Sequence, residues 1–165
     1  MSTAFEVLGR DHEEAKQIFT ELELGLTAAT GADRDHLELR GRIVRHLVVQ
    51  EARHQAVEEM YFWPVVRERL GDGTELASQA QDQEREAKEI LGELDNLTPE
   101  DDEFEGRLAE FIRVARAHIA FEETTVWPSL WAVLRAAESD DLGRRLEEGK
   151  RTGTAMPRRR INGAA

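Results

Sequence analysis

HQAVEEMYFWP (residues 54–64) and HIAFEETTVWP (residues 118–128) are two copies of one pattern: His, three residues, Glu-Glu, three residues, Trp-Pro. A His and a Glu four positions apart lie on one face of an α-helix, about 6 Å apart along its axis, so both can reach one metal ion. The repeated pattern therefore predicts two helices that each offer such a pair, His54 with Glu58 and His118 with Glu122.

Breaker and capping sequences divide the chain into four helical stretches. They are TGAD, GDGT and DNLTPED, at residues 30–33, 71–74 and 95–101. The segments between them lack the polar and apolar alternation of strands and are rich in Ala, Leu, Glu, Gln and Arg. Because the connections are short, we expect an all-α fold, an up-down-up-down antiparallel four-helix bundle. Its helices are predicted at about residues 3–28, 34–70, 75–95 and 100–137.

Pro64 and Pro128 fall inside two of these predicted helices. A proline removes one backbone hydrogen bond, so each should kink its helix, or end its regular part, about one turn beyond the Glu-Glu pair. The apolar pattern continues after each proline, in VVRERL and SLWAVL, so we expect both helices to stay whole with a bend. Trp63, Trp127 and Trp131 are expected to pack at this end of the bundle.

The chain of 165 residues fits one domain with a C-terminal extension. We assign residues 1–138 to the bundle and residues 139–165 to the extension. DLGRRLEEGK is expected to form a short helix, and RTGTAMPRRRINGAA a flexible basic tail. Arg158–Arg160 are interpreted as a solvated terminus and not as a binding patch, because the rest of the chain is acidic.

Composition narrows the classes of function. The formal net charge is −12, which argues against a nucleic-acid partner held by phosphate neutralisation. The absence of cysteine excludes disulfides, thiolate metal sites and cysteine nucleophiles. The first residues have no signal-peptide pattern, and no apolar run is long enough to span a membrane. We therefore expect a cytoplasmic protein without a membrane partner; its oligomeric state is not encoded in any pattern.

Ionisable side chains interrupt the inward-facing stripe of every predicted helix near its middle. The stripes follow steps of three and four residues and are apolar at their ends. A carboxylate left unpaired in a bundle core costs several kcal/mol, so these groups should converge on something they share. If the chain folds back around residues 72 and 98, the third helix places Glu84 level with both repeats. The six groups are His12, His54, Glu58, Glu84, His118 and Glu122.

Imidazole and carboxylate ligands without thiolate suit iron, manganese or zinc. Three His and three Glu, with two carboxylates able to bridge, favour a dinuclear, redox-active metal pair. Tyr61, one turn beyond Glu58, is either a core tyrosine or a phenolate ligand or hydrogen-bonding neighbour of the metals. Glu59 and Glu123 should face other groups, such as the imidazoles of the ligands.

The sequence resembles the hemerythrin-like proteins with the HHE cation-binding domain. GRDHEEAK around His12 and the two repeats carry this resemblance, which extends to about residue 150. It implies a non-heme, oxo- or hydroxo-bridged pair of iron ions in a four-helix bundle. Glu58 and Glu122 would then bridge the irons, and His12, His54 and His118 would be terminal ligands.

The third helix departs from the family pattern. It carries no histidine where the family usually has one, and Glu84 stands in that place. We expect Glu84 to be a ligand, with Gln83 or a neighbouring acid as the alternative. More anionic oxygen stabilises ferric iron and lowers its potential, which favours oxidative or peroxide chemistry over reversible oxygen carriage.

The resemblance and this departure together imply a protein that reacts with O2 or H2O2. If it is an enzyme, we expect catalase-like decomposition of hydrogen peroxide in oxidative or nitrosative stress defence. One alternative is a non-catalytic protein that binds or senses O2, NO or iron. Another is a structural bundle in which zinc replaces missing core stability.

Overall fold

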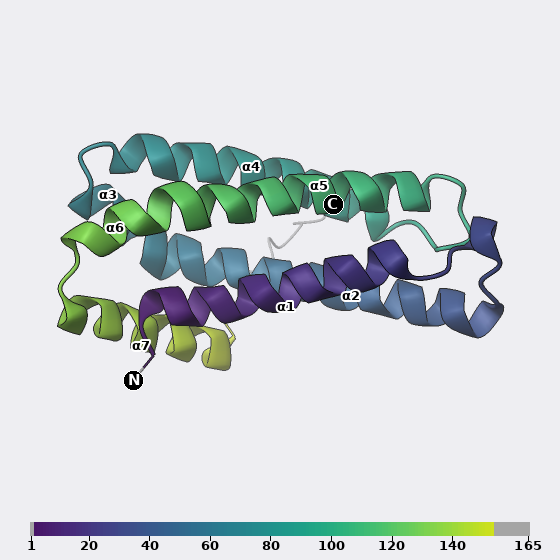
Figure 1. Cartoon of the computed structure of the whole chain (residues 1–165), viewed down its shortest axis with the longest axis horizontal. Helices are drawn as coiled ribbons and strands as arrows, with labels where there is room; N and C mark the ends of the chain where they lie inside the picture. The colour runs from purple at the N-terminus through teal and green to yellow at the C-terminus, as the bar shows by residue number, and fades with distance from the viewer. Residues whose placement is uncertain (1, 154–165) are drawn as a thin grey trace, which may run out of the picture.

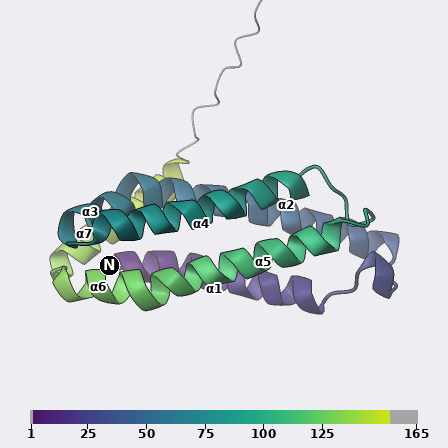
Figure 2. The same ribbon diagram turned by 90° about the horizontal axis from the view of Figure 1, so that it is seen from above.

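The computed structural model describes residues 2–153, which form helices joined by short turns. Four helical rods lie side by side in an elongated bundle, and α7 lies against one end of it (Figures 1 and 2). This confirms the expected all-α bundle of antiparallel neighbours. The rods are α1 (Ala4–Leu24); α2 (Arg34–Val57), η2 (Glu58–Phe62) and α3 (Trp63–Arg69); α4 (Gly73–Leu94); and α5 (Phe104–Phe121), η3 (Glu122–Val126) and α6 (Trp127–Val133).

Three helix boundaries differ from the prediction by about four residues, and one of them is the end of the fourth predicted helix, at Val133 and not at residue 137. The first helix ends at Leu24, and a 3₁₀ turn, Ala28–Thr30, leads to Asp33, whose side chain accepts from His36 N and begins α2. α5 begins at Phe104 because the preceding residues form a turn in which Asp101 Oδ2 accepts from Thr98 N. Side-chain hydrogen bonds to the backbone thus compete with helix formation at the other two boundaries.

Each repeat contains one π-helical turn, and that turn begins at the first Glu of the pair. In the first copy Trp63 N donates to Glu58 O, five residues back, and in the second Trp127 N donates to Glu122 O. The widened turn places each proline in the first turn of the α-helix that follows, where a missing N–H is tolerated. The irregular backbone therefore lies at the Glu-Glu pair itself and not, as predicted, one turn beyond it.

Two apolar clusters fill the two halves of the bundle and leave a polar layer between them. One cluster includes Phe19, Leu47 and Phe111, and the other includes Leu8, Trp63 and Leu130. The second and fourth rods run parallel to each other along the bundle axis (Figure 1). In both repeats, therefore, the His precedes the Glu in the same direction along the bundle. This arrangement brings both pairs into the polar layer.

Residues of the predicted C-terminal extension form most of α7 (Ala136–Thr152), which is longer than the predicted short helix and begins within the range assigned to the bundle. It packs against α1, α2 and the π turn of the first repeat. Two glycines allow this close approach, since a Cβ on Gly143 would lie 2.2 Å from Ser2 O and a Cβ on Gly149 would lie 2.6 Å from Tyr61 Cε2. The predicted basic tail with Arg158–Arg160 lies outside the described residues.

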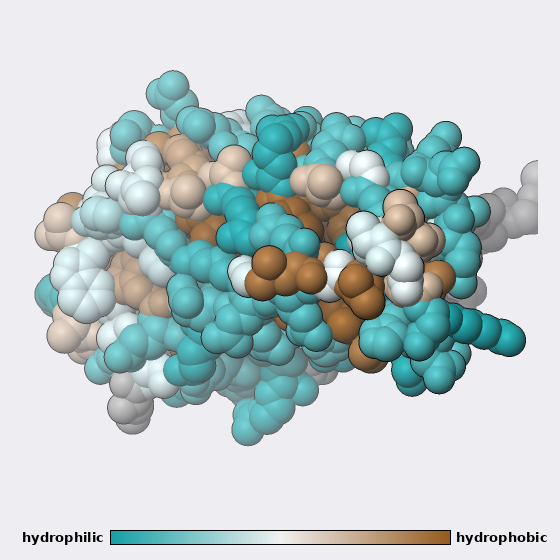
Figure 3. Space-filling model, turned by 45° about the vertical axis from the view of Figure 1, so that its right-hand side comes forward, coloured by the Kyte–Doolittle hydropathy of each residue, from teal (hydrophilic) through white to brown (hydrophobic). Residues whose placement is uncertain are grey.

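The surface shown in Figure 3 is mostly hydrophilic, and hydrophobic side chains show between the hydrophilic ones in several places. This agrees with a chain in which 34% of the residues are charged. Among residues 2–153, no helix has the length and apolar character needed to span a membrane.

Candidate metal centre

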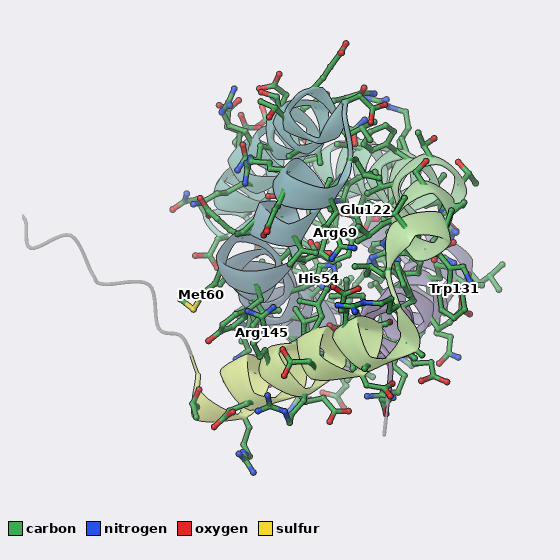
Figure 4. All side chains as sticks on the ribbon, turned by 90° about the vertical axis from the view of Figure 1, so that its left-hand side faces the viewer. His54, Met60, Arg69, Glu122, Trp131 and Arg145 are labelled. Carbon is green, nitrogen blue, oxygen red and sulfur yellow. The ribbon has the colours of Figure 1, made fainter. Side chains whose placement is uncertain are left out.

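The six ionisable residues expected on the inward stripes meet in the polar layer of the bundle. All are buried, and the side chains of Glu58 and Glu122 are 0% exposed. Viewed along the bundle, His54 and Glu122 project into the interior, whereas Met60 and Trp131 lie on the outside (Figure 4). The six offer two groups of ligand atoms, each within 4.8 Å of one another, and the groups share Glu58 and Glu122. The first group adds His12 and His54, and the second adds His118 and Glu84.

The Nε2 atoms of the three histidines face carboxylate oxygens without donating to them. Nε2 lies 3.1 Å from Glu122 Oε2 in His12, 3.3 Å from Glu58 Oε2 in His54 and 3.4 Å from Glu122 Oε1 in His118. None of these contacts has hydrogen-bond geometry, and both oxygens of Glu58 and of Glu122 lack a hydrogen-bond partner within residues 2–153. Seven buried polar atoms without partners around one space are a strong indication of a shared ligand.

The spacing of these atoms fits metal ions. Two ligands bonded to one cation at about 2.1 Å stand about 3.0 Å apart at a right angle and about 3.4 Å apart in a tetrahedron. The observed separations of 3.1, 3.3 and 3.4 Å fall in this range. The donors are imidazole nitrogens and carboxylate oxygens, which suit iron, manganese or zinc. The residues present therefore fit metal binding, with Glu58 and Glu122 common to both groups of ligand atoms.

Each histidine is held at its other nitrogen by a side chain outside the ligand set. The Nδ1 atom lies 3.1 Å from Glu123 Oε1 in His12, 3.0 Å from Asp11 Oδ2 in His54 and 3.0 Å from Gln83 Oε1 in His118. Carboxylate and carbonyl oxygens accept hydrogen bonds, so Nδ1 donates, and in a neutral imidazole the lone pair is then on Nε2. The three lone pairs are thereby directed into the shared space.

Lysines hold two of these three acceptors. Lys16 Nζ lies 2.9 Å from both carboxylate oxygens of Glu123, and Lys150 Nζ donates to Asp11 Oδ1. Asp11 sits between Lys150 and His54, and both neighbours lower its pKa although burial alone would raise it. Gln83, the acceptor for His118, is neutral.

The tryptophans of the two repeats have different contacts with the centre. Trp63 Nε1 donates to Glu84 Oε1 at 3.2 Å. The ring of Trp127 stacks on that of His12, with centroids 4.8 Å apart and an interplanar angle of 11°. Trp131 is 60% exposed and contacts Phe5. Trp63 and Trp127 thus pack at the predicted end of the bundle and also contact the centre, which the sequence did not predict.

The remaining predicted site residues lie around the centre. Glu123 contacts His12, as described above, whereas Glu59 is exposed. The ring of Tyr61 packs against Gly149 of α7. Neither Glu59 nor Glu123 belongs to the two groups of converging ligand atoms.

Burial and mutual repulsion shift the pKa values of the buried groups. Burial and the charge of Glu122 raise the pKa of Glu58 well above its usual value, and they raise the pKa of Glu84 to about 7. Burial also opposes ionisation of Glu122, but nearby histidines, His118 first, outweigh it and lower the pKa of Glu122. Burial would lower the pKa of His54, yet neighbouring carboxylates, Glu58 first, raise it to about 10. Protons thus offset the carboxylate charge of the metal-free chain, and a cation would displace them.

Two cavities reach the centre. One of about 170 Å³ lies beside the three histidines, and its wall includes Gln50, Glu51 and Lys150. The side-chain oxygen of Gln50 is buried and has no hydrogen-bond partner in the described part of the chain. A groove of about 570 Å³ between α2 and α4 reaches Glu84 and shares Glu51 with the first cavity. The centre is therefore accessible to small polar molecules.

Comparison with known proteins identifies the family. Residues 3–130 match the sequence model of the Hemerythrin HHE cation binding domain. The chain belongs to this family. It therefore has a cation-binding domain, and residues 3–130 include all six of the converging His and Glu residues.

Two relatives of this HHE domain differ in what they share with it. The crystal structure of a hemerythrin HHE cation-binding domain-containing protein from Mycobacterium kansasii has the same fold, with a TM-score of 0.74 over 92% of this chain and 90% of that chain, at 21% identity. A DNA nickase from Nostoc sp. is 25% identical over 125 residues, which are 76% of this chain and 32% of that protein. The chain thus spans about a third of the length of the nickase.

Sequence reasoning predicted Glu123 as a partner of an imidazole, named Gln83 only as an alternative ligand and missed Asp11. Asp11 and Gln83 directly precede His12 and Glu84, the two proposed ligands on the helices outside the repeats. A residue next to an inward-facing ligand is turned by about 100° toward a neighbouring helix, so a polar residue there was an available signal. Lys150 gave no such signal, because its position depends on how α7 packs.

Proposed function

We propose that this HHE domain binds two iron ions and decomposes hydrogen peroxide, with a role in cytoplasmic defence against oxidative or nitrosative stress. The observation that carries the proposal is the set of seven buried atoms around one space that lack a hydrogen-bond partner among the described residues. Its composition, three imidazoles and three carboxylates without thiolate, is suited to a redox-active pair. The bound pair would supply two-electron redox chemistry, so that one peroxide is oxidised to O2 and a second is reduced to two water molecules.

The protein's own residues would hold and separate the two ions. Both oxygens of Glu58 and of Glu122 lack a hydrogen-bond partner within residues 2–153, so each Glu can give one oxygen to each ion. His12 and His54 complete one position, and His118 and Glu84 complete the other. Four protein ligands per ion leave coordination positions for a small molecule.

The cavity beside the histidines favours peroxide over dioxygen as the reacting molecule. Hydrogen peroxide donates two hydrogen bonds, whereas O2 donates none. The wall offers Gln50 Oε1, a buried acceptor without a partner in the described part of the chain, together with the carboxyl group of Glu51. A volume of about 170 Å³ holds a small molecule with some water, since a cavity of about 150 Å³ admits benzene. We assign Gln50 to peroxide binding.

Glu84 adds to the case against reversible oxygen carriage. It gives the second position an anionic oxygen in place of a neutral imidazole, which stabilises the oxidised ion. Trp63 donates to Glu84 Oε1 and so orients this carboxylate toward the centre. Tyr61 is proposed to be a packing residue, whose ring lies between the π turn and α7. Loss of a visible absorption band in Tyr61→Phe would instead show that Tyr61 is a phenolate ligand.

The direct test is metal analysis and a peroxide assay on the same purified sample. The proposal predicts about two irons per chain and oxygen evolution on addition of peroxide. Two irons without oxygen evolution would contradict catalysis and favour a protein that binds or senses O2 or NO. Manganese in place of iron, with oxygen evolution, would change the proposed metal and leave the proposed reaction in place. Redox-inert zinc without turnover would mean that the metal site is structural.

The role of Gln50 has its own test. Gln50→Leu should raise KM for peroxide roughly fivefold, because one neutral hydrogen bond contributes about 1 kcal/mol. Iron content should stay unchanged, since Gln50 is not among the ligands. Gln79→Leu, the same change at an exposed position of α4, is the matched control. Equal KM values in the two variants would remove Gln50 from the peroxide site.

A further inference from the structure

We propose that Lys150 of α7 is a positioning residue for the metal centre, because it holds Asp11 in the orientation that meets His54. The inference rests on the proposed function insofar as His54 is taken as a metal ligand. It makes α7, which lies beyond the part of the chain that matches the family model, a working part of the centre.

The geometry is a chain of contacts across three helices. Lys150 Nζ on α7 donates to Asp11 Oδ1 on α1, and the other oxygen of Asp11 lies 3.0 Å from His54 Nδ1 on α2. Each oxygen of Asp11 thus has one partner, and the carboxylate cannot rotate without losing both. The side chains of Asp11 and Lys150 are 20% and 31% exposed, so water screens this contact less than it screens a surface ion pair.

His12, which shares a proposed ion position with His54, has the same kind of support. Lys16 Nζ contacts both carboxylate oxygens of Glu123, and Glu123 Oε1 lies 3.1 Å from His12 Nδ1. His12 and His54 belong to one group of converging atoms, whereas His118, in the second group, is held by the neutral Gln83. Both imidazoles of one ion position are therefore in contact with a carboxylate that a lysine holds. Neither His118 nor Glu84, in the other position, has such a partner among the described residues.

Docking of α7 does not require Lys150. The helix is already fixed by Leu142 and Leu146, which are 1% and 0% exposed, and by the close approaches of Gly143 and Gly149. A basic residue in the last turn of a helix is favourable in itself, but the exposed Arg151 occupies that turn as well. What distinguishes Lys150 from Arg151 is its contact with Asp11.

The test compares Lys150→Met with Arg151→Gln, which removes the same charge one residue away. In the iron-loaded protein, Lys150→Met should release iron to a chelator at least tenfold faster, the usual consequence of losing a partner of a metal-ligating histidine. Its midpoint potential should fall, because the charge of Asp11 then acts on His54 without compensation. Lys150→Arg should restore both values. A release rate and potential equal to those of Arg151→Gln would overturn the proposal.

A double-mutant cycle shows whether Lys150 acts through Asp11. In an Asp11→Asn background, Lys150→Met should change the release rate little further. If it still accelerates release tenfold, Lys150 acts by another route and the proposal is wrong.

A readout without metal separates this inference from the proposed function. In the metal-free protein, the ring N–H of His54 that faces Asp11 should exchange slowly with water. Exchange should become faster in Lys150→Met, stay slow in Arg151→Gln, and stay unchanged at His118 in both. If the wild type binds no iron but shows this pattern, the proposed function fails and the positioning role stands. If His54 exchange is the same in all variants, the positioning role fails whatever the metal content.

Discussion

Residues 54–64 and residues 118–128 have the same backbone and different surroundings. In both copies the helix changes from α to π geometry at the first Glu, and the tryptophan N–H bonds to that residue's carbonyl oxygen. In both copies this first Glu is completely buried and each of its oxygens lacks a hydrogen-bond partner within residues 2–153. The repeat therefore encodes a local structure that aims one His and one Glu into the bundle.

The contacts made by the two copies are not equivalent. His54 is held by a carboxylate and His118 by a neutral amide. Trp63 donates to a proposed ligand, whereas Trp127 stacks on one and its Nε1 lacks a partner in the described residues. The helices outside the repeat thus decide the charge and hydrogen bonding around each group of converging ligand atoms, and two copies of one pattern form an asymmetric centre.

Removal of either buried Glu tests the equivalence of the two copies. Because Glu58 and Glu122 both belong to both groups of ligand atoms, Glu58→Gln and Glu122→Gln should each reduce the metal content from about two ions per chain to nearly none. Metal analysis by mass spectrometry measures this. Glu59→Gln, at the exposed neighbour, is the control and should keep both ions. A variant that retains one full ion would show that its Glu serves one position and does not bridge.

Glu84 should make the stability of the metal-free protein depend on pH. Its pKa is raised from 4.5 to about 7, so the folded chain holds this proton more tightly than the unfolded chain does. Its carboxyl therefore costs no stability below pH 4.5, costs progressively more as the pH rises to about 7, and costs at most about 3 kcal/mol above that. Glu84→Gln should remove this cost.

Urea unfolding of the metal-free protein between pH 4 and 8 measures the effect. The free energy of unfolding of Glu84→Gln relative to wild type should rise between about pH 4.5 and 7 and then level off. Glu86→Gln, at an exposed position on the same helix, should show no such rise. A difference that does not vary with pH would mean that Glu84 ionises normally.

The two tryptophans should differ in what their replacement costs. Trp63 is fully buried and donates to Glu84, so Trp63→Phe leaves a void and an unpaired oxygen and should cost about 2–3 kcal/mol. Trp127→Phe keeps a ring for His12 and loses no hydrogen bond to residues 2–153, so it should cost about 1 kcal/mol or less. Urea unfolding of both variants provides the comparison. Equal costs would mean that the hydrogen bond to Glu84 contributes nothing.

The local and the non-local parts of the centre were not equally predictable. The six converging residues could be predicted because each lies on the inward stripe of a helix, where an ionisable group is anomalous. The turn type could not be predicted from the prolines, since a kink and a π turn both accommodate the missing N–H.

Contacts between helices were largely hidden in the sequence. Trp63 looked like ordinary packing, because its donor role depends on how α4 places Glu84 across the bundle. Lys150 lies 139 positions from Asp11, in a helix predicted only as a short extension. A sequence shows which face a residue occupies; which partner it meets there is set by tertiary packing.

Replacing Gln83 by Glu would give the histidine of the second copy, His118, the same kind of hydrogen-bond acceptor as the histidine of the first copy. His118 would then donate to a carboxylate, as His54 does, and stronger electron donation through the imidazole should stabilise the oxidised ion. The expected result of Gln83→Glu is a small fall in midpoint potential with the metal content unchanged. Gln79→Glu adds the same charge to an exposed position of α4 and reports the effect of charge alone. If both variants shift the potential equally, the partner of His118 does not set the electronic difference between the two ion positions, and the asymmetry would have to come from Glu84.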